Sequence, residues 1–68
     1  MENINKLVGT NIKKYRNKKG WTQEDLALEA NLHRAYIGQI ERGEKNIGVK
    51  NLAKIAKSLN TKIENLVK

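Results

Sequence analysis

Two short segments with helical spacing of their apolar residues are separated by only three residues, and this connection constrains the fold more than any other feature. The segments cover residues 23–30 and 34–42. Thr22 and Asp25 have the spacing of a capping box that starts the first helix. Asn31 tolerates the left-handed backbone conformation that commonly ends a helix. A turn this short forces a sharp angle between the two helices.

The rest of the chain shows the same period. Apolar residues three and four positions apart predict a helix from Ile4 to near Gly20 and another from Val49 that Asn60 ends. Residues 61–64 read as a capping box that opens a last short helix. The glycines are expected to lie between helices. No alternating pattern indicates a strand, so the sequence predicts an all-α fold of five helices.

The size of the chain limits what it can be. It has 68 residues and no cysteine, which is near the lower limit for a core without disulfides or metal, so we expect one domain over residues 1–68. One histidine and no cysteine offer no catalytic set and no zinc site. An enzyme, a metal, a cofactor and a small-molecule ligand are therefore not expected. No apolar run resembles a signal peptide or a membrane span, which predicts a soluble cytoplasmic protein.

The charge balance points to an anionic partner. Fourteen Lys and Arg residues against seven Asp and Glu residues give a formal net charge of +7, which suits DNA, RNA or an anionic membrane. The basic first helix lacks the bulky aromatic face of a membrane anchor. When a tight turn joins two helices, one helix can lie in the DNA major groove while the other supports it across the DNA backbone. Double-stranded DNA is therefore the favoured partner.

The helical wheel of residues 34–42 predicts which side chains reach DNA. With Ile37 and Ile40 inward, the outward residues are Arg34, Ala35, Gly38, Gln39 and Arg42. We expect base contacts from the Arg34 fork on guanine, from Gln39, and from the Ala35 methyl on a thymine methyl. Gly38 is expected to let the two backbones approach closely. The expected DNA backbone contacts are Arg42, Asn46, Lys50 and Tyr36. For Tyr36, a ring half-buried in the protein is an equally good interpretation.

The same segments resemble a known family. Residues 23–27, 40–43 and 52–60 carry the sequences Gln-Glu-Asp-Leu-Ala, Ile-Glu-Arg-Gly and Leu-Ala-Lys-Ile-Ala-Lys-Ser-Leu-Asn. These resemble the phage-repressor/Cro (XRE) helix-turn-helix family over roughly residues 9 to 66. Within it, residues 32–37, 40–43, 46–47 and 50–52 are most similar to the controller proteins of restriction-modification systems.

The resemblance adds further expectations. It implies a compact lambda-repressor-like fold, a phosphate contact from Gln23 at the start of the second helix, and base contacts from Lys45. It also implies a partly buried ion pair between Arg16 and Glu41. If the controller resemblance holds, the protein activates and then represses its own gene and an endonuclease gene, with RNA polymerase as a further partner. Glu24 and Asp25 are the candidate polymerase contacts.

One small module contacts too few base pairs for tight specific binding, so a homodimer on a palindromic operator is expected. The candidate dimer contacts are Ile63, Leu66 and Val67, with the outer face of the fourth helix. For Ile63 and Leu66, burial in the core of the same chain is as good an interpretation as a dimer contact. A phage-type repressor and the antitoxin of a toxin-antitoxin pair remain the competing functions.

Overall fold

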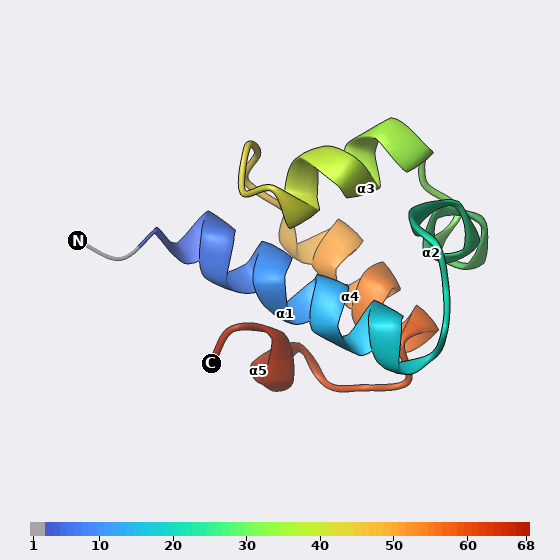
Figure 1. Ribbon diagram of the computed structural model, residues 1–68. Helices are drawn as coiled ribbons and strands as arrows, with labels where there is room; N and C mark the ends of the chain where they lie inside the picture. Colours follow the sequence, from blue (N-terminus) through green and yellow to red (C-terminus); the bar gives the residue numbers. More distant parts are fainter. Residues whose placement is uncertain (1–2) are drawn as a thin grey trace.

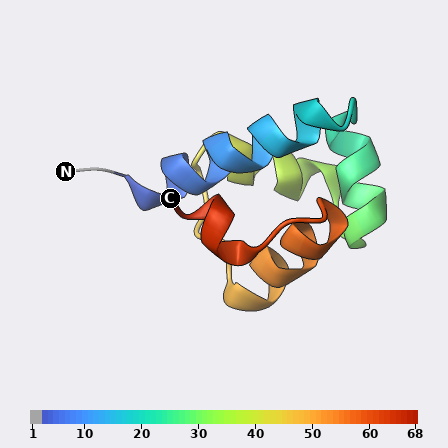
Figure 2. The same ribbon diagram turned by 90° about the horizontal axis from the view of Figure 1, so that it is seen from below.

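A computed structural model describes residues 3–68, which form five helices around one core (Figure 1). The helices are α1 (Ile4–Lys18), α2 (Gln23–Ala30), α3 (Arg34–Glu41), α4 (Val49–Ser58) and α5 (Ile63–Leu66). α1 packs against α3 on one side and α5 on the other, and α4 contacts α2 and α5. Figure 2 shows α5 lying next to both α1 and α4. The all-α prediction is confirmed.

The turn between α2 and α3 forms as its sequence predicts. The Thr22 hydroxyl accepts a hydrogen bond from the Asp25 amide at 3.1 Å, and the Asp25 carboxylate accepts one from the Thr22 amide at 2.8 Å. Asn31 ends α2 in the left-handed conformation, with φ of 57°. The Leu32 amide then donates to the Ala27 carbonyl at 2.8 Å. The capping box therefore fixes where α2 begins, and the left-handed turn at Asn31 fixes where α2 ends and α3 leaves it.

The capping box predicted at residues 61–64 is wrong. α5 starts one residue later than that pattern requires, with Lys62 as its cap and no side-chain cap bond. The Thr61 hydroxyl instead accepts from the Asn65 amide group at 3.0 Å. Two other helices end slightly earlier than predicted. α1 ends at Lys18 instead of near Gly20, and α3 ends at Glu41 instead of Arg42.

Two glycines, Gly9 and Gly38, lie inside helices that the sequence predicts, and both are buried. Gly9 is buried where α1 crosses α3, and a Cβ there would overlap the carbonyl oxygen of Ile40 and stand 2.8 Å from that of Glu41. Gly38 is buried within α3. By contrast, Gly20 and Gly43 follow helix ends with positive φ, as expected. The missing side chain of Gly9 lets α1 support the back of α3 at close range.

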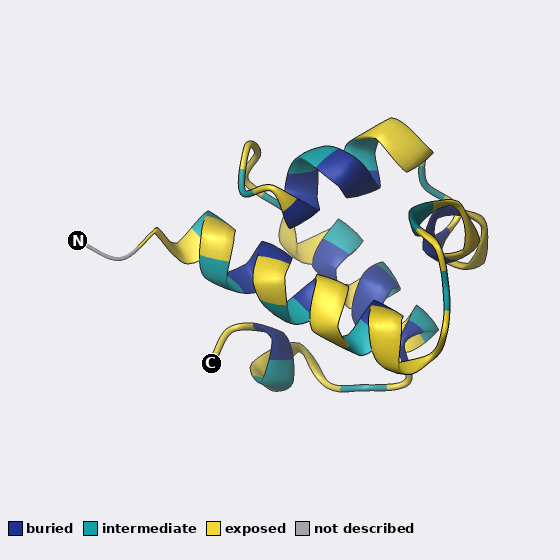
Figure 3. Ribbon diagram, viewed as in Figure 1, coloured by how far each residue is buried: buried dark blue, intermediate teal, exposed yellow. Residues whose placement is uncertain are grey.

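The core is aliphatic and joins all five helices. Its buried residues are Val8, Ile12, Leu26, Ala27, Ala30, Ile37, Ile40, Leu52, Ile55, Ala56, Leu59 and Leu66. Figure 3 shows them on the inward surfaces of the helices, with exposed residues on the outer faces.

Leu66 belongs to this core, which corrects its assignment to a dimer surface. Its side chain has no exposed area. The Asn11 amide group donates to its carbonyl at 3.0 Å and to that of Lys68 at 3.3 Å, which ties the end of the chain to α1. Leu66 is therefore unavailable to a second copy, whereas Ile63 and Val67 keep 36% and 39% of their surface exposed. Within residues 3–68, none of the helices has the length and apolar character needed to cross a membrane.

Candidate nucleic-acid interface

The first turn of α3 is the most accessible part of that helix. His33, Arg34 and Ala35 are all exposed, while Ile37 and Ile40 are fully buried on the opposite face. Figure 3 shows this exposed turn at the end of α3 next to α2. His33 provides no side-chain cap, so the first amides of α3 receive no bond from it. The turn therefore presents a free guanidinium and a methyl group at one end of a rigid helix.

Gln23 and Arg34 come together across a shallow hollow between the starts of α2 and α3. Thr22 and Glu24 also line it, and Arg16 lies at its floor. The predicted phosphate contact and the predicted base reader thus lie on one surface.

Arg42 follows α3 and makes an ion pair that sequence reasoning missed. Its Nε donates to Glu44 Oε2 at 2.8 Å and its Nη2 donates to Glu44 Oε1 at 3.2 Å. The hydrogen bonds and the charge of Glu44 raise the pKa of Arg42, and the same contacts lower the pKa of Glu44. The two residues are only two positions apart. Side chains at this spacing do not face each other in a helix, and in a turn their contact cannot be predicted from the spacing alone.

Arg42 also explains why Gly38 is not an open approach for DNA, which corrects that expectation. A Cβ on Gly38 would lie 3.1 Å from Arg42 Nη1 and 3.5 Å from Gln23 Oε1. The guanidinium therefore folds back over α3 and covers the glycine. Gln39, next to it, is half-buried.

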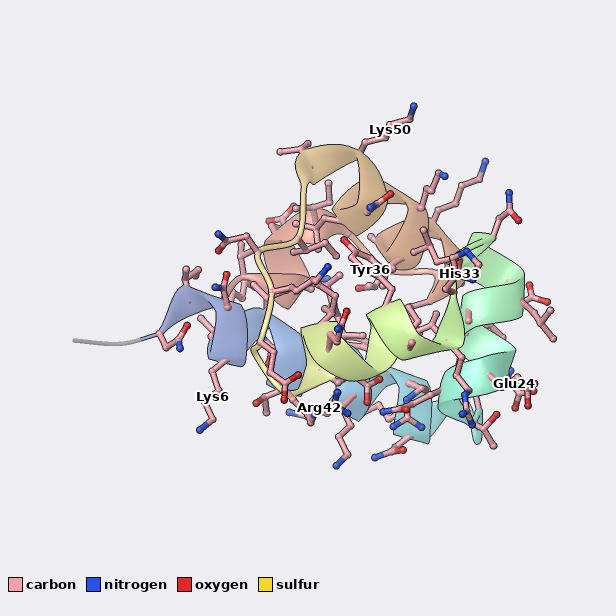
Figure 4. The ribbon with its side chains drawn as sticks, turned by 90° about the horizontal axis from the view of Figure 1, so that it is seen from above. Lys6, Glu24, His33, Tyr36, Arg42 and Lys50 are labelled. Carbon is pink, nitrogen blue, oxygen red and sulfur yellow. The ribbon has the colours of Figure 1, made fainter. Side chains whose placement is uncertain are left out.

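Tyr36 takes the half-buried alternative. Its ring packs against the core, and its hydroxyl accepts a hydrogen bond from the Asn51 amide group of α4 at 3.1 Å. Figure 4 shows the ring directed from α3 toward α4. Asn51 is fifteen positions away in the chain, and no local pattern points to this pairing.

The remaining predicted contacts surround α3 on its α4 side. Lys45 and Asn46 are exposed in the loop after α3, and Lys50 is exposed at the start of α4. Figure 4 shows Lys50 extending away from the molecule beyond Tyr36, at the other side of α3 from Arg42 and Lys6. α5, which carries Ile63 and is followed by Val67, lies on the opposite side of α1 from α3 (Figure 1).

The Arg16–Glu41 ion pair is present and holds the back of α3. Arg16 Nε donates to Glu41 Oε2 at 2.7 Å and Nη2 donates to Oε1 at 2.9 Å, while the two side chains are 9% and 2% exposed. Arg16 Nη1 donates to the Trp21 carbonyl at 2.8 Å. The bonds to Glu41 raise the pKa of Arg16, although burial opposes the rise. Gln23 Nε2 donates to Glu41 Oε1 at 3.0 Å, so the pair also orients the predicted phosphate contact.

Residues 12–66 match the helix-turn-helix family HTH_3. The chain belongs to this family. It is 41% identical to control protein C.SmaI of Serratia marcescens over 64 residues, which cover 94% of this chain and 76% of that protein. It is likewise 41% identical to control protein C.BamHI of Bacillus amyloliquefaciens over 66 residues, or 96% of this chain and 82% of that protein.

Solved structures give the same result. The restriction-modification controller protein C.AhdI from Aeromonas hydrophila superimposes with a TM-score of 0.88 and 34% identity, covering 91% of this chain and 94% of that one. The biofilm regulator SinR, solved in complex with DNA, has a TM-score of 0.86 and 31% identity over 90% of this chain and 98% of that one. This helix-turn-helix chain is therefore similar to restriction-modification controllers in both sequence and fold. The compact five-helix, lambda-repressor-like architecture that the family resemblance implies is confirmed.

Arg16→Ala should destabilise this helix-turn-helix domain before it changes any sequence preference. It leaves the Glu41 carboxylate buried without its partner, at a cost of about 3–5 kcal/mol. A domain of this size has a total stability of roughly 3–10 kcal/mol, so we expect a large fall in melting temperature by circular dichroism. Lys13→Ala, on the exposed side of α1, is the matched control and should melt like the parent protein. Equal melting temperatures for the two variants would contradict a structural role for the pair.

Proposed function

We propose that this chain is a sequence-specific transcriptional regulator that binds double-stranded DNA with α3 in the major groove. The observation that carries the proposal is the exposed first turn of α3, where Arg34 stands on a helix whose back is locked by the buried Arg16–Glu41 pair. A base-reading guanidinium needs such a rigid support, because bidentate hydrogen bonds to a guanine edge depend on its position. The formal charge of +7 supplies the attraction to the phosphates.

Each predicted contact has a distinct role in this complex. Arg34 and Ala35 read base edges from the first turn of α3, with Gln39 and Lys45 at flanking bases. The backbone contacts fix the register of α3 along the groove, and they come from Gln23, Arg42, Asn46 and Lys50, whereas the half-buried Tyr36 supports α3 from the side of α4. The cytoplasm is the proposed place of action. A catalytic activity is not proposed, and within residues 3–68 no group of three or more His, Asp or Glu side chains is placed as metal ligands would be.

Similarity to the control proteins favours a controller role over a phage-type repressor or an antitoxin. The regulated genes would then be its own and an endonuclease gene, activated at low occupancy and repressed when further dimers bind. The operator would be a palindrome, with half-sites about one helical turn apart.

Replacing Arg34 and Lys50 should separate base reading from phosphate attraction. Arg34→Ala should flatten base preference, because a bidentate Arg–guanine contact contributes about 1–3 kcal/mol of discrimination. Lys50→Ala should weaken binding to all sequences alike and reduce the slope of log affinity against log salt by about one. Selection of bound sites from random duplexes, followed by anisotropy titrations at several salt concentrations, measures both effects. The proposal fails if the parent protein selects no sequence, or if Arg34→Ala keeps the parent's preference.

The proposed homodimer uses the face of α5 that the core leaves open. Ile63 and Val67 are both partly exposed there, on the far side of α1 from α3. Two copies joined through this face would leave both α3 helices free for DNA. The outer face of α4 borders it, because α4 packs against α5.

Sedimentation velocity should therefore detect a dimer whose fraction rises with concentration. Val67→Glu should shift the protein toward monomer, because it places a charge at an apolar contact. Asn17→Glu makes the same charge change on an exposed position of α1 and should leave the dimer fraction unchanged. A strict monomer at micromolar concentration, even with operator DNA present, would rule out the dimer.

An RNA polymerase contact is proposed on the outer face of α2. Glu24 and Leu28 are one helical turn apart, and Leu28 is a large apolar side chain that the rest of residues 3–68 leaves 75% exposed. Leu28→Ser should abolish activated transcription in vitro while leaving the dissociation constant for operator DNA unchanged. Ile4→Ser, at an exposed apolar residue of α1, should leave both unchanged. Normal activation by the Leu28 variant would exclude this surface.

A further inference from the structure

The ion pair between Arg42 and Glu44 lies on the surface that the proposed function turns toward DNA. The two side chains are 58% and 53% exposed, so both are open to solvent and to a bound duplex. An exposed pair of this kind is held weakly, because water and salt compete for each charge. It can therefore open when a stronger anion approaches Arg42.

The carboxylate of Glu44 occupies the edge of the guanidinium that a phosphate would use. Two nitrogens, Nε and Nη2, donate to the two carboxylate oxygens, and this paired geometry suits carboxylate and phosphate alike. The third nitrogen, Nη1, is turned inward over Gly38. Arg42 thus cannot make a bidentate phosphate contact while it keeps Glu44.

The backbone holds Glu44 in this place. The Glu44 amide donates to the Gln39 carbonyl at 2.9 Å, and Gly43 turns the chain with φ of 75°. A Cβ on Gly43 would come within 2.9 Å of the Lys6 Cα on α1, so the turn is packed against the body of the domain. The carboxylate therefore belongs to a supported turn rather than to a free loop. Its carboxyl is charged at neutral pH, as an ordinary glutamate is, and the hydrogen bonds and charge of Arg42 lower its pKa further.

We infer that Glu44 sets the absolute affinity of this domain for duplex DNA, by competing with phosphate for Arg42. The inference rests on the proposed function, since it assumes that Arg42 contacts the DNA backbone. Because phosphates are the same in every sequence, Glu44 lowers binding to operator and non-operator DNA by the same factor. Arg34 then determines the preference between sequences, and Glu44 lowers the affinity for every duplex alike.

The Glu44→Gln variant tests this inference, because the glutamine side chain has nearly the same shape as glutamate but carries no charge. We expect it to tighten binding about two- to fivefold more than Glu64→Gln does, a factor suited to an exposed ion pair. Glu64 is exposed on α5, away from α3, and both variants raise the net charge by one. Because Glu64 lies between Ile63 and Val67, sedimentation must first show that each variant keeps the parent's dimer fraction. Anisotropy titrations at fixed salt on the selected site and on a scrambled duplex should give the same gain on both. The ratio of the two affinities should stay at the parent value.

The Arg42→Gln background separates competition from simple repulsion between Glu44 and DNA. In that background, Glu44→Gln should do no more than Glu64→Gln, because there is no guanidinium left to release. A gain that persists there shows plain repulsion and overturns the inference. Equal effects of the two glutamate variants in the parent background also overturn it, and so does weaker binding by Glu44→Gln, which would make Glu44 a residue that positions Arg42. If the parent protein binds no duplex at all, the proposed function itself has failed.

Discussion

Arg16 donates hydrogen bonds from all three of its guanidinium nitrogens, and the placement of α3 depends on where they go. Two reach Glu41 at the end of α3 and one reaches the Trp21 carbonyl just before α2. Gln23 of α2 then donates to the same carboxylate. One buried charge therefore joins α1, α2 and α3. Such a pair contributes little net stability compared with an apolar contact, but its hydrogen bonds favour one relative arrangement of the three helices.

The parts of the fold that depend on neighbours in the sequence could be predicted from the sequence. The cap of α2 needs only Thr22 and Asp25, and its end needs only the tolerance of Asn31 for positive φ. The outward position of Arg34 follows from the helical period once Ile37 and Ile40 are assigned to the core. Each of these inferences uses interactions within about one helical turn, where residue type alone decides the geometry.

The parts that depend on distant contacts could not be predicted in this way. Glycine is a residue type that weakens helices, yet Gly9 lies inside α1, where it allows close packing against residues of α3 more than thirty positions away. Tyr36 is half-buried because Asn51, on another helix, binds its hydroxyl. The spacing of Leu66 fits a dimer contact and a core contact equally well, and the folded chain places it in the core. The Arg16–Glu41 pair spans 25 positions, and only resemblance to a family pointed to it.

The two ion pairs at the end of α3 have the same chemistry and opposite consequences, and solvent is the reason. Glu41 and Glu44 each accept two hydrogen bonds from an arginine fork, three positions apart in the chain. The Glu41 carboxylate is almost without exposed surface, so exchanging its partner would leave a buried charge unpaired and the pair stays closed. The Arg42–Glu44 pair is in water, so a phosphate can replace the carboxylate at small cost. The inner pair therefore determines where α3 lies, and the outer pair is the one that can respond to DNA.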